Sequence, residues 1–296
     1  MISKEKLINE ISECRELVEQ KLGQILPSTD ERYATLIEAM RYSLLEGGKR
    51  IRAVICMKFC EAAGGDKQDA LNAACAIEML HAYTLIHDDL PCMDNDDMRR
   101  GKPSNHIKYG EFTATLAGDA MQALAFDTLL RSKLLPETLV QMAMTFSNAA
   151  GPHGVCAGQY LDLSGQGKGL TKTELLENYS LKTSMLISTA AQMGVLAAGG
   201  TLIQALAASE YAESIGIAFQ ARDDILDCIS TEDELGKPIG SDAENQKTTL
   251  VSLLGLEKCE ELVCTETENA CHAISRHFVD AEFLKSLAHH LSDRKN

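Results

Sequence analysis

Apolar residues recur at helical spacing along most of this chain of 296 residues. They fall three and four positions apart, which is the period of an amphipathic helix, and Gly-Gly pairs or Pro interrupt the pattern. No alternating pattern of useful length predicts a strand. The sequence therefore predicts an all-α fold, with helices at about 6–26, 33–45, 51–63, 69–87, 111–133, 136–150, 171–198, 201–229, 244–254 and 257–291.

No shift in composition marks a linker, so we expect one domain over residues 1–296. The most apolar stretch, 185–208, is interrupted by Ser, Thr and Gln residues and by Gly199-Gly200, which favours two buried core helices over a membrane span. Residues 1–20 are charged and periodic, unlike a secretory signal. The cysteines lack the spacing of a disulfide framework. These features predict a cytoplasmic protein that does not insert into membranes.

The formal net charge is −15, and no Lys/Arg-rich tract offsets it. Its long-range field should repel nucleic acid and anionic membrane surfaces, so neither is an expected partner. Anionic substrates would require local cations or bound metal ions to reverse the field at the site.

Five aspartates within ten residues follow the apolar helix predicted at 69–87. The helix dipole makes the C-terminal end of a helix unfavourable for anions unless cations offset them. The segment also fits a solvated acidic loop. A calcium loop of the EF-hand type is disfavoured, because residues 94–99 lack its Gly and its distal Glu.

A second acidic cluster lies inside an apolar helix, where its side chains share one face. Gln220, Asp223, Asp224 and Asp227 follow i, i+3, i+4, i+7 spacing. Like charges at this spacing destabilise a helix unless something neutralises them. Magnesium is the natural candidate, because it is often held by one or two carboxylates plus substrate phosphates.

Five ordered motifs resemble those of the short-chain trans-prenyl diphosphate synthases, over residues 40–255. Asp88, Asp89 and Asp94, followed by Arg-Arg-Gly-Lys-Pro at 99–103, resemble the first aspartate-rich motif of that family, and 223–227 resembles the second. The other matches are Gly-Gly-Lys-Arg-Ile-Arg at 47–52, Gly-Gln-Tyr-Leu-Asp at 158–162 and Lys-Thr at 182–183. The resemblance implies a single-domain helical bundle of the isoprenoid synthase type with a central cavity, and a homodimer.

The activity implied by the resemblance is condensation of isopentenyl diphosphate with dimethylallyl or geranyl diphosphate, giving farnesyl diphosphate and pyrophosphate. About three Mg²⁺ ions per site are implied, with Mn²⁺ as a substitute. Asp88, Asp94 and Asp223 are the expected magnesium ligands, supported by Asp89, Asp224 and Asp227.

Basic and polar residues of the motifs are expected to hold the two diphosphates. The allylic diphosphate would contact Arg99, Lys182, Thr183, Gln220, Lys237 and Lys247, of which Arg99 and Lys182 also take part in catalysis. Isopentenyl diphosphate would lie, without metal, on Lys49, Arg52, His81 and Arg100. Arg suits this role because its planar fork donates two parallel hydrogen bonds to phosphate oxygens.

Product length is expected to depend on Tyr83 and Thr84, near the first aspartate motif. In a helix, the Tyr83 backbone would lie roughly 7 Å below that of Asp88, but the two side chains would point in clearly different directions around the helix axis. An aromatic residue five positions before the motif resembles bacterial-type farnesyl synthases, which makes Tyr83 the expected floor of the pocket. A geranylgeranyl diphosphate synthase remains an open alternative.

Two other classes compete with this interpretation. Terpene cyclases share the fold, but their second metal site typically reads N/D-D-x-x-S/T-x-x-x-E, whereas this chain has Asp-Asp-Ile-Leu-Asp at 223–227. A non-catalytic partner subunit usually lacks one aspartate motif, and both are present here. Both alternatives are therefore disfavoured.

Overall fold

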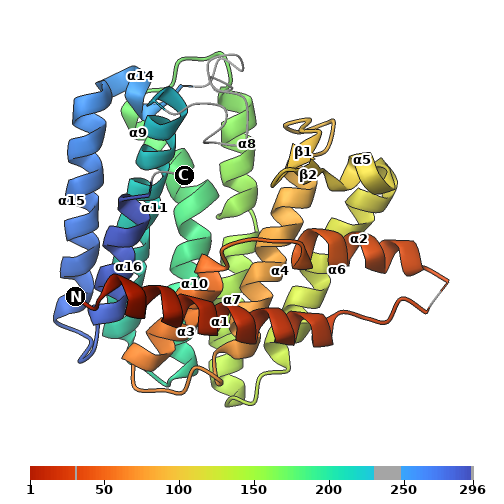
Figure 1. Cartoon of the computed structure of the whole chain (residues 1–296), viewed down its shortest axis with the longest axis horizontal. Coiled ribbons are helices and arrows are strands. Elements are labelled where there is room, and N and C mark those ends of the chain that lie inside the picture. The colour runs from red at the N-terminus through yellow and green to blue at the C-terminus, as the bar shows by residue number, and fades with distance from the viewer. Residues whose placement is uncertain (31, 230–247, 295–296) are drawn as a thin grey trace.

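The computed structural model describes residues 1–30, 32–229 and 248–294. It confirms the predicted all-α fold, with one short hairpin in addition to the helices (Figure 1). The elements are α1 (Lys4–Ile25), α2 (Ala34–Leu45), α3 (Ile51–Ala62), α4 (Leu71–Asp88), β1 (Met98–Arg99), β2 (Lys102–Pro103), α5 (Asn105–Tyr109), α6 (Glu111–Leu130), α7 (Pro136–Ala150), α8 (Val155–Gly165), α9 (Lys172–Tyr179), the π-helical turn η1 (Ser180–Ser184), α10 (Met185–Ala197), α11 (Leu202–Ile229), α14 (Leu250–Leu254), α15 (Leu256–Ser275) and α16 (Glu282–Ser292).

The long helices run side by side, while α1 and α2 lie across them (Figure 1). Helix α4 packs against α3 and α6, α10 packs against α3 and α11, and α15 covers α11. The predicted stretch 185–208 forms α10 and the start of α11, whose inner faces are buried in the main core. Within the described residues, no helix is long and apolar enough to cross a bilayer.

Several features of the chain differ from the predicted helices, among them the short helix α5, which was not expected. Helix α8 was not predicted, because its glycines at positions 158 and 165 weaken the helical signal. The segment predicted as one helix over 257–291 is two helices, α15 and α16, separated at 276–281. Phe278 in this connection is buried against Phe59, with ring centroids 5.4 Å apart. The break escaped prediction because the connection contains neither Gly nor Pro.

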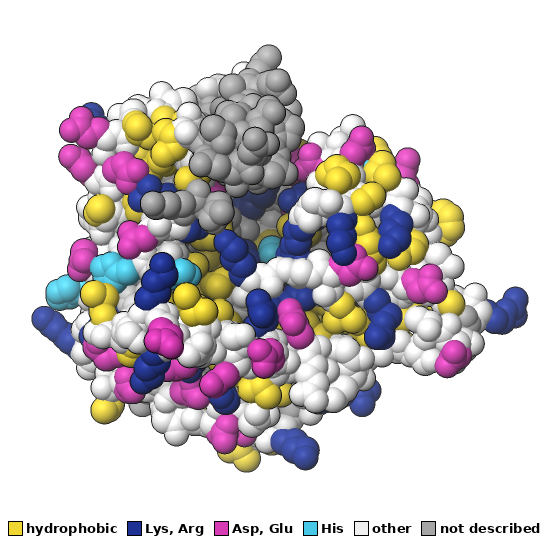
Figure 2. Space-filling view, in the orientation of Figure 1, with side chains coloured by type: hydrophobic (Ala, Val, Ile, Leu, Met, Phe, Trp, Pro, Cys, Tyr) yellow, Lys and Arg dark blue, Asp and Glu magenta, His cyan; other side chains and the backbone are white. Residues whose placement is uncertain are grey.

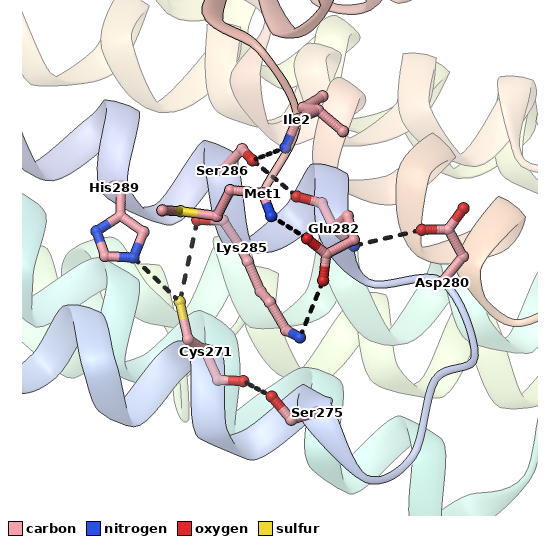
Figure 3. Close-up of polar contacts among 9 residues, drawn as sticks. All are labelled: Met1, Ile2, Cys271, Ser275, Asp280, Glu282, Lys285, Ser286 and His289. Atoms are coloured by element: carbon pink, nitrogen blue, oxygen red, sulfur yellow. Dashed lines mark hydrogen bonds and ion pairs between the residues drawn. The ribbon is translucent and has the colours of Figure 1, made fainter.

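The N-terminal residues dock onto α16 (Figure 3). The Met1 amino group pairs with Glu282, and the backbone N–H of Ile2 donates to Ser286 Oγ at 3.0 Å. Further along α16, His289 Nε2 lies 3.8 Å from Cys271 Sγ of α15. These contacts position α16, whose C-terminal end borders the cavities described next.

Candidate active site

Two adjoining cavities lie between the central helices. The larger, about 450 Å³, is lined mainly from α4 and α8, and the smaller, about 260 Å³, lies between the start of α3 and the end of α16. They share Arg52, His81 and Thr183. Figure 2 shows Lys and Arg side chains gathered around a hollow on this face. The arrangement gives one predominantly apolar chamber beside one cationic chamber.

The first aspartate motif lies at the mouth of the larger cavity. Asp88 is the last residue of α4, and the chain folds back so that the Asp94 N–H donates to the Asp88 carbonyl at 2.9 Å. Burial raises the pKa of the Asp88 carboxyl to about 7; Lys182 opposes the rise and Asp94 adds to it. Asp88 thus lacks enough positive charge around it in the protein alone.

The second aspartate motif projects from α11, and its three carboxylates differ in their partners. Asp223 pairs with Arg294, and Asp224 accepts from the Tyr179 hydroxyl at 2.8 Å and from the Leu250 N–H at 2.6 Å. Asp227 is buried, and its Oδ1 has no hydrogen-bond partner among the described residues. Asp224 therefore anchors α9 and α14, whereas Asp227 keeps an acceptor oxygen without a partner among the described residues.

These carboxylates fit a magnesium site only in part by themselves. No three His, Cys, Asp or Glu side chains of the described residues come together closely enough to hold a metal. Magnesium, however, is usually held by one or two carboxylates and completed by phosphate and water oxygens. The weakly compensated Asp88 and the unpartnered Asp227 oxygen provide such incomplete ligand sets.

The two arginines that follow the first motif lie in a β-hairpin with a two-residue turn, Arg99 in strand β1 and Arg100 in the turn. Met98 pairs with Pro103 and Arg99 with Lys102, and both turn residues have positive φ, 55° at Arg100 and 74° at Gly101. Such a turn matches the twist of the paired strands. Arg99 Nε donates to Asp89 at 2.9 Å, whereas Arg100 Nη1 donates to the Gly47 carbonyl at 2.8 Å. Arg100 thus reaches the smaller cavity, whereas Arg99 is held beside Asp89 and lines neither of the two cavities.

The Gly-Gly-Lys-Arg motif is a tight turn between α2 and α3. Its φ angles are 95° at Gly47, 116° at Gly48 and 52° at Arg50, and a Cβ on Gly48 would lie 3.1 Å from Arg100 Nη1. Glycine takes up the φ values of positions 47 and 48 without steric cost, whereas Arg50 lies in the left-handed region that side chains rarely adopt. The buried Arg50 donates to the Leu44 carbonyl at 2.5 Å and pairs with Glu78 at 3.5 Å. This network fixes the turn that carries Lys49 and Arg52.

The basic residues of the smaller cavity crowd one another. Burial lowers the pKa of His81 well below its usual value, and Arg52 and Arg100 lower it further. Burial likewise lowers the pKa of Arg52 and of Arg100. Arg52 Nε has no partner among the described residues. The structure therefore brings together Lys49, Arg52, His81 and Arg100 around a space suited to an anion.

Lys182 is positioned where α8 approaches the π-helical turn. A Cβ on Gly158 would lie 2.4 Å from the Lys182 backbone nitrogen, so only glycine permits this approach. The Lys182 ammonium pairs with Asp162. Burial lowers the pKa of Lys182, but Asp162, Asp88 and Asp94 raise it by more. Lys182 thus remains a cation between the Gly158–Asp162 motif and the first aspartate motif.

The remaining predicted contacts to the allylic group divide into two sets. Thr183 Oγ1 donates to Gln220 Oε1 at 3.0 Å, which joins the Lys-Thr motif to α11. Lys237 and Lys247 lie outside the described residues.

Tyr83 and Thr84 both line the larger cavity, as does Asp88. The Tyr83 ring is buried, packs edge-on against His87 with centroids 5.6 Å apart, and places its hydroxyl 3.7 Å from Cys156 Sγ on α8. Thr84 Oγ1 instead donates to the His81 carbonyl at 2.9 Å. Tyr83 therefore reaches across the cavity despite its unfavourable helical phase.

Arg294 is the chief site residue that the sequence did not reveal. It follows α16, pairs with Asp223, and stacks over the Phe219 ring at 3.6 Å. No motif or periodic pattern includes it, since its partner lies 71 residues away in the sequence. Asp162 was noticed only as part of a motif, and its partner Lys182 could not be assigned without the helix packing.

Comparisons with known proteins agree with this arrangement. A geranylgeranyl pyrophosphate synthase from Capsicum annuum chloroplasts is 45% identical over 227 residues, covering 76% of this chain and 62% of that protein. A farnesyl diphosphate synthase from Geobacillus stearothermophilus is 41% identical over 275 residues, covering 92% and 91%. This chain spans less than two thirds of the length of several plant relatives.

The fold is also that of solved proteins. The geranylgeranyl pyrophosphate synthetase of Pyrococcus horikoshii matches with a TM-score of 0.89 at 31% identity, over 98% of this chain and 99% of that one. This match confirms the predicted isoprenoid synthase type of bundle. Residues 33–287 match the polyprenyl synthetase family. The chain therefore belongs to the polyprenyl synthetase family.

Proposed function

We propose that this protein is a trans-prenyl diphosphate synthase that condenses isopentenyl diphosphate with dimethylallyl or geranyl diphosphate. The observation that carries the proposal is the pair of adjoining cavities. One combines an acidic mouth with a predominantly apolar interior, and the other is surrounded by cations. An allylic diphosphate with a prenyl tail suits the first, and a short, metal-free diphosphate suits the second.

The residues of the chain would hold the two substrates with their reacting carbons close together. Lys182, with Arg99, stabilises the charge that develops on the departing pyrophosphate when the allylic C–O bond breaks. The double bond of isopentenyl diphosphate, held on Arg52 and its neighbours, then attacks the allylic carbocation. The released pyrophosphate takes the proton lost in the last step, so no protein base is assigned. Thr183 and Gln220 provide oxygen dipoles beside the cation.

Asp88, Asp94 and Asp223 would hold magnesium, with Asp89, Asp224 and Asp227 in support. About three Mg²⁺ ions, with Mn²⁺ as a substitute, would supply positive charge that stabilises the leaving diphosphate. A non-catalytic partner subunit is disfavoured, because Asp88 lines the larger cavity and Asp224 lines an adjoining pocket that shares Lys182 and Thr183 with it.

Farnesyl diphosphate is the product we propose. Its support is the buried Tyr83 ring, which reaches across the cavity to α8 and limits the depth available to a growing tail. Geranylgeranyl diphosphate is a second candidate, favoured by relatives of that name at 45% and 47% identity. Chromatography of the products made from isopentenyl and geranyl diphosphates distinguishes them. A main product of 15 carbons supports the first proposal, and one of 20 carbons supports the second.

Arg52→Gln should raise the KM for isopentenyl diphosphate by about 10- to 100-fold, because it removes a charge-assisted hydrogen bond to phosphate. The KM for geranyl diphosphate should change much less. Steady-state kinetics with each substrate varied in turn measures both values. Arg131→Gln is the matched control, since Arg131 is exposed and paired with Asp127 far from the cavities. A larger effect on the KM for geranyl diphosphate would show that the two substrates have been assigned to the wrong cavities.

A homodimer forms part of the proposal, and helices α6 and α7 offer a surface for it. Large apolar side chains recur there at helical spacing and stay exposed in the single chain, with Phe112 at 76%, Val140 at 58% and Met144 at 69%. Apolar exposure of this kind marks association surfaces in soluble proteins. A second copy related by a two-fold axis would bury the same side chains on both subunits.

Joint replacement of Val140 and Met144 by Asp should convert a dimer to monomer, because like charges would then meet across the interface. Light scattering after gel filtration gives the mass directly. Leu202→Asp is the control, because Leu202 is equally exposed, at 75%, but lies on α11. A double variant that stays dimeric would exclude this face, and a monomeric wild type would exclude the dimer.

A further inference from the structure

Gln159 is a buried polar residue whose side chain has no partner. It lies on α8 and is 9% exposed, yet neither Oε1 nor Nε2 forms a hydrogen bond with any described residue. A buried amide in this state costs free energy, and native proteins rarely leave one unexplained. The residue belongs to the Gly158–Asp162 motif, whose Gly158 and Asp162 serve to position Lys182. Gln159 has no such structural partner.

The position of Gln159 along α8 indicates what it meets. Three residues earlier, Cys156 lies beside the Tyr83 hydroxyl, and three residues later, Asp162 holds Lys182. With a rise of about 1.5 Å per residue, Gln159 lies roughly 4.5 Å along the axis from each of them. It lines the same cavity as Asp88 and Lys182. Gln159 therefore lies between Lys182, which would hold the diphosphate, and Tyr83, the expected floor of the cavity. The prenyl tail of the substrate would begin at this depth.

From this placement we propose that Gln159 is a further catalytic residue, which contacts the scissile C–O bond of the allylic diphosphate. Its amide N–H donates to the diphosphate oxygen that takes the electron pair when this bond breaks. Its carbonyl oxygen faces the allylic carbons that become positive. No proton is transferred. An amide provides a donor and an acceptor about 2 Å apart, and fixed dipoles act strongly where water is excluded. The role rests on the proposed function.

Gln159→Met tests the role, because Met has a similar length but cannot form these contacts. With both substrates at saturation, kcat should fall about 100-fold, the usual effect of removing one preorganised donor. The KM for isopentenyl diphosphate should stay within about twofold, since that group lies in the other cavity. The thermal midpoint should rise by about 2–4 °C, because an unsatisfied buried amide has been removed. A purely structural residue would lose stability together with activity.

Two further variants complete the test. Gln159→Glu keeps the shape of the side chain but loses the N–H donor, so it should show the same loss of kcat. If the Met variant does not fold, the kcat of Gln159→Glu tests the role instead. Gln192→Met is the control, because the Gln192 amide on α10 donates to Ser188 Oγ at 3.0 Å, away from both cavities. A folded Gln159→Met enzyme with kcat within about threefold of wild type would overturn the role. A wild type that never consumes isopentenyl diphosphate would instead contradict the proposed function itself.

Discussion

Asp88→Ala and Asp223→Ala should each lower kcat by roughly 10³-fold or more while leaving the protein helical. Each change removes an expected magnesium ligand, and charge stabilisation by metal is worth several kcal/mol in the transition state. The fold should survive because both side chains are only half-buried. Turnover is measured with isopentenyl and geranyl diphosphates, and far-UV circular dichroism reports the helix content.

Asp127→Ala is the matched control, since Asp127 is a carboxylate at the far end of α6, paired with Arg131 at 2.7 Å. It should retain wild-type turnover. Excess chelator should abolish turnover of the wild type, and added Mg²⁺ should restore it. Near-normal activity of both aspartate variants, or full activity in chelator, would contradict the metal-dependent mechanism.

Tyr83→Ala should change the main product from farnesyl to geranylgeranyl diphosphate. Removing the ring opens the cavity between α4 and α8, so that a tail of 20 carbons fits where one of 15 carbons ended. The variant should also lose about 3–5 kcal/mol of stability, as large aromatic truncations in a core do. Product chain length is read by chromatography after dephosphorylation, under conditions where the variant remains folded.

Tyr33→Ala is the control for this change, because Tyr33 is 54% exposed at the start of α2 and should not affect the product. An active Tyr83→Ala enzyme with an unchanged product would show that Tyr83 is not the floor. In that case geranylgeranyl diphosphate would become the better interpretation of the wild-type product.

Most of the fold could be predicted from the sequence because its helices are long and their apolar positions are periodic. The exceptions have local causes. Helix α8 contains glycines that serve close packing, with Gly158 against the Lys182 backbone, and not chain flexibility. The bend before α16 is set by burial of Phe278, a tertiary contact that leaves no turn signal. The hairpin at 98–103 is too short to show alternation.

Those residues of the candidate site that lie within sequence motifs could be predicted. Lys49, Arg52, His81 and Arg100 were expected together, and the structure does place them around one cavity. The hydrogen-bond and ion-pair partners of the site residues could not be predicted. Arg99 bonds to Asp89, and Asp224 bonds to Tyr179 and Leu250, because these pairings depend on how the hairpin and α14 pack. The pairing of Asp223 with Arg294 joins α11 to the segment that follows α16, which is distant in the sequence.

We propose that this protein joins two prenyl diphosphates in the cavities between α4, α8 and α11. The most direct test incubates the purified wild type with labelled isopentenyl diphosphate, geranyl diphosphate and Mg²⁺, and measures label in organic-extractable alcohols after phosphatase treatment. We predict rapid, magnesium-dependent labelling of a 15-carbon alcohol that disappears when geranyl diphosphate is replaced by buffer. The absence of label from any longer alcohol, with dimethylallyl or geranyl diphosphate and with Mg²⁺ or Mn²⁺, would contradict the proposed activity.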